Sequence, residues 1–355
     1  MILIVSLTPS TGGAEKYLQN IELYHSNGNL CEVAFITNDK IHKTKFNSNS
    51  IVLRGNKYRY LGFFNFLIFW IKNIKKYDRI YSSHLIVNAF IGFLKTITFS
   101  KITIIAREST SVFLRYSGFR ILLYKFFYKY LYNSINVIVC QTELMKSQLI
   151  NSVSIKNNII VLSNPFKYSE FSYESVKLMG ELNIVAAGRL IHEKGFDILV
   201  ESFNMLCNNF NNVHLYILGE GPERNNLENL IQHYNLNKNI HLLGFVTDPL
   251  KYFSEADVCV ISSRKEGFPN VLLEMLNVNN NVLITPCCGN LNEIPKLTVT
   301  KNVSAISLQN SILLKLKNLD NTLSTKKIIR GYLNGLDTSI FIDQINKFLK
   351  YEFNK

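Results

Sequence analysis

The sequence predicts an α/β protein with two doubly wound domains, each built on a parallel β-sheet. Its 355 residues suffice for two domains of about 100–200 residues each. Hydrophobic residues make up 47% of the chain, which supplies two sizeable cores. In both halves, short β-branched runs that end at turn residues alternate with segments of helical period. Such alternation is typical of right-handed βαβ units, whose strands form a parallel sheet.

The first half opens with a predicted strand at residues 2–7. This strand ends at Thr-Pro-Ser and leads through a Gly-Gly loop into a helix at about 14–26. Further strands are predicted at 31–37, 79–82, 101–106, 137–140 and 159–162, with helical segments between them that include 143–150.

The second half repeats this order. Its predicted strands are 182–187, 213–218, 240–242, 257–261 and 281–285, and its predicted helices are 195–208, 223–234, 249–254, 271–277 and about 338–353.

The domain boundary is predicted between Asn164-Pro165 and Glu181, where the chain is polar and aromatic without a clean period. This gives domains at 1–165 and 181–337, and we expect the C-terminal helix within 338–355 to pack back on the first domain. The carboxyl edges of both sheets should face one cleft, because ligands bind at these edges in doubly wound sheets.

The net charge of +13 belongs to the first half of the chain. Residues 1–170 contain 21 Lys and Arg against 8 Asp and Glu, whereas residues 171–355 contain 18 of each. This excess indicates an anionic partner, either anionic lipid or nucleic acid. No recognition motif supports nucleic acid, so we expect none.

An aromatic and basic stretch at 115–132, RYSGFRILLYKFFYKYLY, favours the lipid. Its rings and cations interleave at roughly helical spacing, as in a helix that lies in a membrane interface. The alternative is a core helix with a solvated basic face.

The remaining composition predicts a cytoplasmic protein that is peripheral at the inner face of the cell membrane. The N-terminus has no charged segment before its apolar run, so we do not predict a signal peptide. The longest apolar candidate, 61–71, is shorter than the roughly 18 residues of a spanning helix. The six cysteines form no C-x-x-C pair or Cys/His cluster, so we expect reduced thiols and no zinc.

A loop between a predicted strand and helix, GRLIHEKG at 188–195, carries two cations five residues apart, Arg189 and Lys194. A planar guanidinium and a compact ammonium can grip a diphosphate from two sides, and backbone N–H groups of the loop and the next helix can join them. The alternative is a pair of solvated loop cations.

Glycines mark two similar junctions, Gly12-Gly13 in the first domain and Gly219-Glu220-Gly221 in the second. They permit close approach of a ligand to the backbone, although turns also use them. The Gly12-Gly13 pair is not a G-x-G-x-x-G fingerprint, so we expect no dinucleotide cofactor.

Two carboxylates lie in the turn and the helix of another predicted strand–turn–helix, at the two ends of the stretch EGFPNVLLE. Glu266 stands at the turn with Gly267 and Phe268, and we expect their backbone N–H groups to point into the cleft. Pro269 suits the first helical turn, and Glu274 follows within an apolar run. Because carboxylates accept hydrogen bonds from vicinal diols, the pair could hold a sugar and a ribose, with the diphosphate between them. The alternative for Glu274 is a helix-surface charge.

These segments resemble the retaining GT-B glycosyltransferases of family 4, in the branch that builds bacterial capsule, O-antigen and related glycans on lipid carriers. The resemblance covers nearly the whole second domain and ordered parts of the first. It rests on TGGAEKYL, VAAGRLIHEKGFDILVESF, LYILGEGPERNNLENLI and HLLGFVTDPLKYFSEADVCVISSRKEGFPNVLLEML.

The resemblance implies a GT-B fold with an acceptor-binding first domain and a donor-binding second domain. It implies that Glu266 contacts the donor sugar, that Glu274 contacts the ribose, and that Arg189 and Lys194 neutralise the diphosphate. His84, at the end of YDRIYSSH, would touch the transferred sugar, although a lone histidine is more often structural. Gly12 and Gly13 would lie near phosphate and acceptor, and Asn164-Pro165 would form the hinge. The other donor-binding positions are Gly188, Gly219, Gly221, Gly267, Phe268 and Pro269.

The implied activity is transfer of a hexose or N-acetylhexosamine, from a nucleotide-diphosphate donor such as a UDP-sugar, to a lipid-linked saccharide. We expect no cofactor and no metal, since the basic pair could replace Mg²⁺ and no Asp-x-Asp motif is present. The segment PCCGNLNEI, around Cys287 and Gly289, has one glycine where the family usually has two, which bears on donor choice. The alternatives are a non-catalytic nucleotide-sugar-binding protein at the membrane surface and another GT-B enzyme, such as a sugar-nucleotide epimerase or a phosphorylase.

Overall fold

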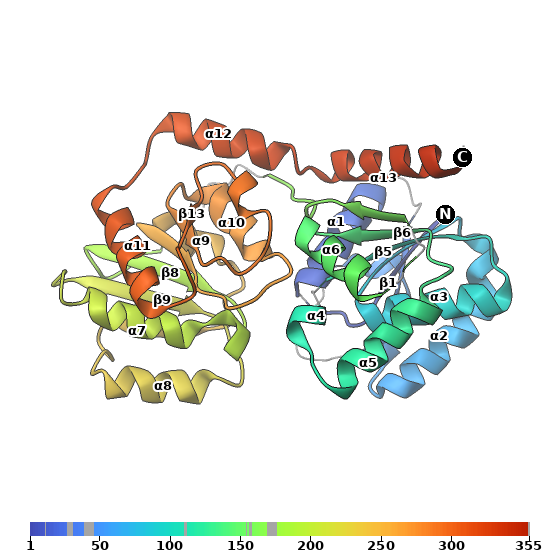
Figure 1. Ribbon diagram of the computed structural model, residues 1–355, viewed down its shortest axis with the longest axis horizontal. Helices are drawn as coiled ribbons and strands as arrows, with labels where there is room; N and C mark the ends of the chain where they lie inside the picture. The colour runs from blue at the N-terminus through green and yellow to red at the C-terminus, as the bar shows by residue number, and fades with distance from the viewer. Residues whose placement is uncertain are drawn as a thin grey trace. The chain divides into compact units, whose positions relative to one another are not determined.

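Two parallel sheets organise the protein, and a computed structural model places each sheet in its own unit (Figure 1). The first unit consists of Met1–Lys167 and Leu336–Lys355, and the second of Tyr168–Gly335. The structure describes residues 1–10, 12–26, 31–38, 46–109, 112–153, 155, 158–168 and 176–353.

In the described part of the first unit, the sheet has seven parallel strands in the order β3-β2-β1-β4-β5-β6-β7. The strands are β1 (Ile2–Ser6), β2 (Cys31–Thr37), β3 (Ile51–Asn56), β4 (Arg79–Ser83), β5 (Thr103–Arg107), β6 (Val137–Cys140) and β7 (Asn158–Val161). Most are continuous apolar runs, as expected for parallel strands that are covered on both faces.

Helices cover both faces of this sheet. They are α1 (Gly13–Ser26), α2 (Arg59–Asn73), α3 (Leu85–Thr98), α4 (Val112–Arg115), α5 (Phe119–Phe126), α6 (Glu143–Ser152) and α13 (Thr338–Phe353). Shorter helical turns are η1 (Ser48–Ser50), η2 (Ile74–Lys76) and the π-helical η3 (Phe127–Leu131).

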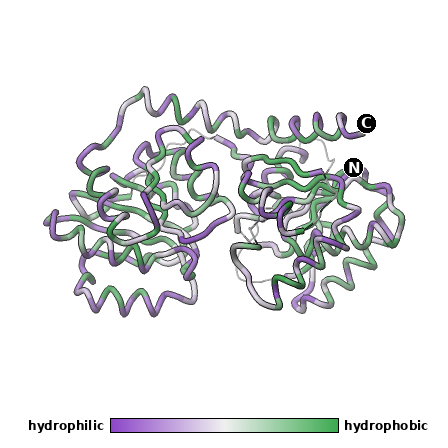
Figure 2. Tube along the Cα trace, viewed as in Figure 1, coloured by the Kyte–Doolittle hydropathy of each residue, from purple (hydrophilic) through white to green (hydrophobic). Residues whose placement is uncertain are grey.

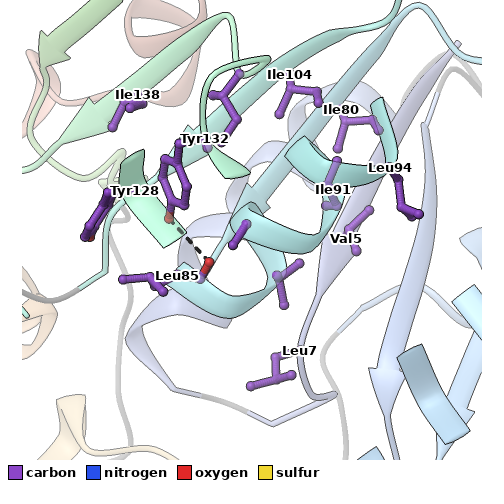
Figure 3. Close-up of a cluster of buried hydrophobic side chains, with 14 of the residues drawn as sticks. Val5, Leu7, Ile80, Leu85, Ile91, Leu94, Ile104, Tyr128, Tyr132 and Ile138 are labelled. Carbon is purple, nitrogen blue, oxygen red and sulfur yellow. Dashed lines mark hydrogen bonds between the residues drawn. The ribbon is translucent and has the colours of Figure 1, made fainter. Parts of the chain in front are cut away.

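One face packs against α2, α3 and η3, in a core that includes Trp70 of α2. Figure 3 shows Ile91 and Tyr132 in this core. The other face packs against α1 and the C-terminal helix α13, whose Phe341 meets the ring of Tyr17 edge-on.

The described part of the second unit has six parallel strands in the order β10-β9-β8-β11-β12-β13. The strands are β8 (Leu182–Ala187), β9 (Val213–Leu218), β10 (Ile240–Gly244), β11 (Val258–Ile261), β12 (Val282–Ile284) and β13 (Thr298–Val299). The helices are α7 (Phe196–Leu206), α8 (Arg224–His233), α9 (Leu250–Glu255), α10 (Asn270–Val278), α11 (Ala305–Lys317) and α12 (Leu323–Asn334), with short turns η4 (His192–Lys194) and η5 (Leu291–Glu293). Figure 2 shows hydrophobic residues gathered in the strands of both units.

The stretch 115–132 does not form the single helix that its spacing predicts. Gly118 has φ +60°, a value that an L side chain rarely adopts, and it separates α4 from α5. The end of the stretch winds as a π-helix and buries Tyr128 and Tyr132, whereas α5 leaves Phe119, Leu122 and Phe126 exposed. The segment therefore combines a core-facing end with an exposed apolar and basic end.

Within the described residues, the helices are all too short or too polar to cross a lipid bilayer.

Candidate functional site

The strand order of the second sheet has a topological switch point between β8 and β11. Strand β8 begins the unit, β9 lies on one side of it, and β11 lies on the other. Successive connections leave a doubly wound sheet in opposite directions at such a switch point, which opens a crevice at the carboxyl ends of the two strands. The loops that follow β8 and β11 contain Lys194 and Glu266, so both residues stand at this edge.

Lys194 and Glu266 form an ion pair between these two loops. The Lys194 Nζ and Glu266 Oε1 atoms lie 2.5 Å apart, and the side chains keep 20% and 14% of their surface exposed. Ser263 Oγ donates to the same Oε1 atom at 2.7 Å. The Oε2 atom of Glu266 accepts no hydrogen bond from the part of the chain that the structure describes. The pair therefore joins the predicted cation and acid, and it leaves one carboxylate oxygen for a ligand.

The loops that carry this pair are joined along their backbones. Ser262 Oγ donates to the carbonyl of Lys194 at 2.9 Å, and the backbone N–H of Arg264 donates to the carbonyl of Glu193 at 2.7 Å. Gly195 has φ +64°, and a Cβ atom there would stand 2.2 Å from the carbonyl oxygen of Ser262. Only glycine allows this approach of the two loops.

A second ion pair, between Arg264 and Asp197, joins the loop after β11 to the start of α7. Arg264 donates to both carboxylate oxygens of Asp197, at 2.7 and 2.5 Å, and also to the carbonyl of His192. Burial alone would raise the pKa of Asp197, but the Arg264 guanidinium outweighs this effect and lowers that pKa. The bidentate geometry fixes the start of α7 relative to the loop after β11.

Arg189 differs from Lys194 in its surroundings. Its side chain is exposed and makes no hydrogen bond or ion pair with the described residues. It stands five residues before Lys194 on the same loop, so its guanidinium is available to an anion without first breaking a contact.

The third predicted loop packs its backbone against the first. Gly219 has φ +145°, and a Cβ atom there would lie 1.9 Å from the carbonyl oxygen of Gly188. A Cβ atom on Gly221 would lie 2.3 Å from the carbonyl oxygen of Leu190. The backbone N–H of Leu190 in turn donates to the carbonyl of Glu220 at 2.9 Å. These glycines hold the cation-bearing loop in place by close packing.

The turn after β11 differs from its prediction in two details. The backbone N–H of Glu266 donates to the carbonyl of Cys287 at 2.9 Å, so the prediction that it faces a ligand is wrong. Pro269 is the N-cap of α10 rather than part of its first turn. Phe268 is buried, and Glu274 lies half-buried on α10.

The unusual segment after β12 therefore touches the candidate site directly. Cys287 is buried, and a hydrogen bond with the neighbouring thiol of Cys288, together with burial, raises its pKa. Its carbonyl fixes the Glu266 backbone, so the change from the family pattern at Cys287–Gly289 lies beside the acid that we expect to meet the donor sugar.

The first sheet has its own switch point, between β1 and β4. The loop after β1 contains Gly12, and Gly13 begins α1, while β4 leads directly into His84. A Cβ atom on Gly12 would stand 2.6 Å from Glu15 Oε2, and the Oε1 atom of the same carboxylate accepts a hydrogen bond from Thr8 Oγ1 at 3.0 Å. The predicted glycines and His84 thus share the carboxyl edge of this sheet.

His84 has a backbone conformation that is unusual for its residue type, with φ +103° and ψ 120°. Such conformations cost about 1–3 kcal/mol and persist where the surroundings enforce them, often at functional sites.

A buried polar network beside His84 was not predicted from the sequence. Arg107 donates to Ser83 Oγ at 3.0 Å and to the side-chain oxygen of Asn164 at 2.7 and 2.9 Å, while Glu108 accepts from two tyrosines. Burial lowers the pKa of Arg107 to about 10 and raises that of Glu108. The sequence carried no signal for this network, because Arg and Glu at the end of a strand are mostly exposed.

Among the described residues, no three His, Cys, Asp or Glu side chains gather closely enough to hold a metal ion.

Comparison with known proteins finds a family model that matches most of the second unit. Residues 169–322 match the family Glycosyl transferases group 1. The matched segment contains Arg189, Lys194, Glu266 and Glu274.

Curated relatives align with about half of the chain. An uncharacterised glycosyltransferase of Methanocaldococcus jannaschii is 33% identical over 201 residues, which are 53% of this chain and 48% of the relative. The N-acetylgalactosamine-N,N'-diacetylbacillosaminyl-diphospho-undecaprenol 4-alpha-N-acetylgalactosaminyltransferase of Campylobacter jejuni is 29% identical over 195 residues, 52% of each chain. The chain spans about half the length of these curated relatives.

Solved structures extend the likeness to the whole chain. The crystal structure of Anabaena Alr3699/HepE in complex with UDP superposes with a TM-score of 0.78, at 15% identity, over 99% of both chains. At this identity the likeness concerns the fold, which is GT-B, as the resemblance of the sequence implied.

Proposed function

We propose that the protein is a retaining glycosyltransferase of the family 4 type that acts in bacterial surface polysaccharide biosynthesis, such as that of capsule or O-antigen. It transfers a hexose or N-acetylhexosamine from a nucleotide-diphosphate donor, a UDP-sugar, to a lipid-linked saccharide. The observation that carries the proposal is the Lys194–Glu266 pair at the switch point of the second sheet, inside the segment that matches glycosyl transferases. The relative from Campylobacter jejuni, whose name includes an undecaprenol-linked acceptor, supports the lipid-linked substrate.

The geometry supports different roles for Lys194, which would bind the diphosphate, and Glu266, which would bind the sugar. An ammonium has three N–H donors, so Lys194 can keep its bond to Glu266 while it donates to a diphosphate oxygen. The sugar attached to that phosphate would then lie beside the open Oε2 atom of Glu266, which can accept from a sugar hydroxyl. Exposed Arg189 would supply a second contact to the diphosphate, and Glu274 would accept from the ribose.

The same cations stabilise the reaction as its charge develops. When the bond between sugar and phosphate breaks, negative charge grows on the leaving diphosphate. Lys194, which Glu266 holds in place, and the exposed Arg189 would both stabilise that charge. In the proposed retaining mechanism, the acceptor attacks from the face that the diphosphate leaves. His84, on the first unit, would contact the transferred sugar.

The decisive experiment incubates the protein with a panel of nucleotide-sugars and a lipid-linked disaccharide, with and without EDTA. We expect one UDP-sugar to yield an extended product with the α- or β-configuration of the donor, at a rate that EDTA leaves within about twofold because cations replace Mg²⁺. Inversion of the anomeric centre would refute retention, and loss of activity in EDTA would refute metal independence. Binding without product would favour the non-catalytic alternative, and an altered sugar nucleotide would favour an epimerase.

We also propose that α5 docks the first unit on an anionic membrane surface, at the inner face of the cell membrane. Its exposed apolar side chains include Phe119 at 80%, Leu122 at 62% and Phe126 at 51% exposed. Arg120 and Lys129 are exposed on the same segment. Rings and aliphatic chains of this kind insert at the headgroup level while the cations pair with lipid phosphates.

A matched pair of variants tests this surface. Leu122→Glu should lower partitioning onto vesicles that contain anionic lipid by about tenfold, because the bilayer would no longer bury the leucine and would repel the new carboxylate. Leu314→Glu, on α11 of the second unit, is the control, since Leu314 is 64% exposed and carries no prediction of membrane contact. Co-sedimentation with vesicles measures both, and equal binding by the two variants would contradict the assignment.

A further inference from the structure

We propose that Tyr132, held by the buried carboxylate of Glu108, is a positioning residue for His84. The inference rests on the proposed function, because it assumes that His84 contacts the transferred sugar. It assigns a role to a part of the first unit that the proposed mechanism does not use.

The turn that carries His84 needs external support. His84 joins β4 to α3 with φ +103°, and its carbonyl begins the helix by accepting from the backbone N–H of Asn88 at 3.0 Å. An isolated turn would relax from this conformation, since the cost of about 1–3 kcal/mol must be met by neighbouring contacts.

Side chains from other elements hold the chain on both sides of His84. Before it, Ser82 Oγ donates to the Asn88 side chain at 2.7 Å, and Ser83 Oγ accepts from Arg107 at 3.0 Å. After it, the carbonyl of Leu85 accepts from the hydroxyl of Tyr132 at 3.3 Å, as Figure 3 shows.

Glu108 ties these supports together. It is 3% exposed, and its Oε1 atom accepts from Tyr132 at 2.7 Å and from the amide of Asn88 at 3.3 Å. Its Oε2 atom accepts from Tyr128 at 2.6 Å. Burial raises the pKa of Glu108, while the tyrosine and asparagine donors favour its charged form. A buried carboxylate is costly and is tolerated only when its oxygens are satisfied, so this network admits few arrangements of Tyr132 and Asn88.

Tyr128 provides a matched control for Tyr132. Both rings are buried, and their centroids lie 4.7 Å apart. Each hydroxyl donates to Glu108. Only the Tyr132 hydroxyl also reaches the carbonyl of Leu85, next to His84, at 3.3 Å, through the one proton that it shares with Glu108. Loss of either hydroxyl removes one hydrogen bond to Glu108, but only loss of the Tyr132 hydroxyl also removes contacts with Asn88 and with the carbonyl of Leu85, and so should release the turn.

The test compares Tyr132→Phe with Tyr128→Phe in the full-length protein. We expect Tyr132→Phe to lower kcat about tenfold with the KM for the donor nearly unchanged, because a small misplacement of a contacting group slows the chemical step. Tyr128→Phe should stay within about twofold of the wild-type kcat. In a His84→Ala background, Tyr132→Phe should have no further effect, since it acts through the missing side chain.

A second readout does not depend on activity. The ring resonances of His84 in NMR spectra, assigned by their absence in His84→Ala, should shift in Tyr132→Phe and stay in place in Tyr128→Phe. Equal kcat losses in the two variants, an undiminished effect in the His84→Ala background, or unmoved His84 resonances would overturn the inference. If the wild-type protein transferred no sugar, the proposed function would fall, and the NMR comparison would still decide whether Tyr132 positions His84.

Discussion

Lys194→Ala is expected to lower kcat at least about a hundredfold, in a protein that still folds. Removal of one preorganised donor to a developing anion costs roughly 3–4 kcal/mol in comparable sites. The substitution removes two interactions here, the contact with the diphosphate and the ion pair with Glu266 at 2.5 Å. Without Lys194, the Glu266 carboxylate keeps only its hydrogen bond to Ser263 within the described residues. Folding should survive, since both side chains are partly exposed and the crossing backbone bonds between the loops do not involve the ammonium.

Arg189→Ala should cause a loss of similar size for a simpler reason. The side chain is exposed and makes no hydrogen bond or ion pair with the described residues, so its only expected partner is the diphosphate. Lys238→Ala is the control, because Lys238 is an exposed cation that precedes β10, at the opposite edge of the same sheet. Steady-state rates with the donor found in the panel, and circular dichroism of each variant, measure the outcome. Near-wild-type rates for both Lys194→Ala and Arg189→Ala would rule out the assigned diphosphate site.

The strands were predictable because parallel strands that are covered on both faces read as continuous apolar runs. Leu182–Ala187 and Val213–Leu218 appear in the structure with their predicted bounds. Strand β3 was missed because its sequence, IVLRGN, alternates exposed and partly buried positions at the edge of the sheet. Helices α11 and α12 were missed because they follow the segment at Cys287–Gly289 that departs from the family pattern, and no motif of the resemblance lies beyond it.

The site was predictable only as far as strand ends determine it. Loops at the carboxyl ends of neighbouring parallel strands must meet, so Lys194 and Glu266 could be placed at one edge although 72 positions separate them. Their direct pairing, and the use of the Glu266 N–H by Cys287, depend on loop conformations that residue spacing does not specify. The same holds for Glu108, whose tyrosine partners lie on a stretch that the sequence presented as a membrane helix.

Gly219→Ala should destabilise the second unit by about 3 kcal/mol or more. Two costs coincide at this position. The backbone has φ +145°, which an L side chain rarely adopts, and the new methyl group would stand 1.9 Å from the carbonyl oxygen of Gly188. Because that oxygen belongs to backbone at the end of β8, it cannot rotate away as a flexible side chain would. The loop from Gly188 to Lys194 must therefore move, and activity should fall together with stability.

Gly331→Ala separates this packing effect from a general effect of adding a methyl group. Gly331 lies within α12, and nothing stands within 4 Å of a Cβ atom built there. Alanine at an open helical position should stabilise the helix by up to about 1 kcal/mol, through its better helix propensity. Urea unfolding followed by far-UV circular dichroism would measure both variants. If Gly219→Ala unfolded at the same urea concentration as the wild type, close packing of Gly219 against Gly188 would not position the loop that carries Arg189 and Lys194. The close packing that holds Lys194 against Glu266 would then need another source.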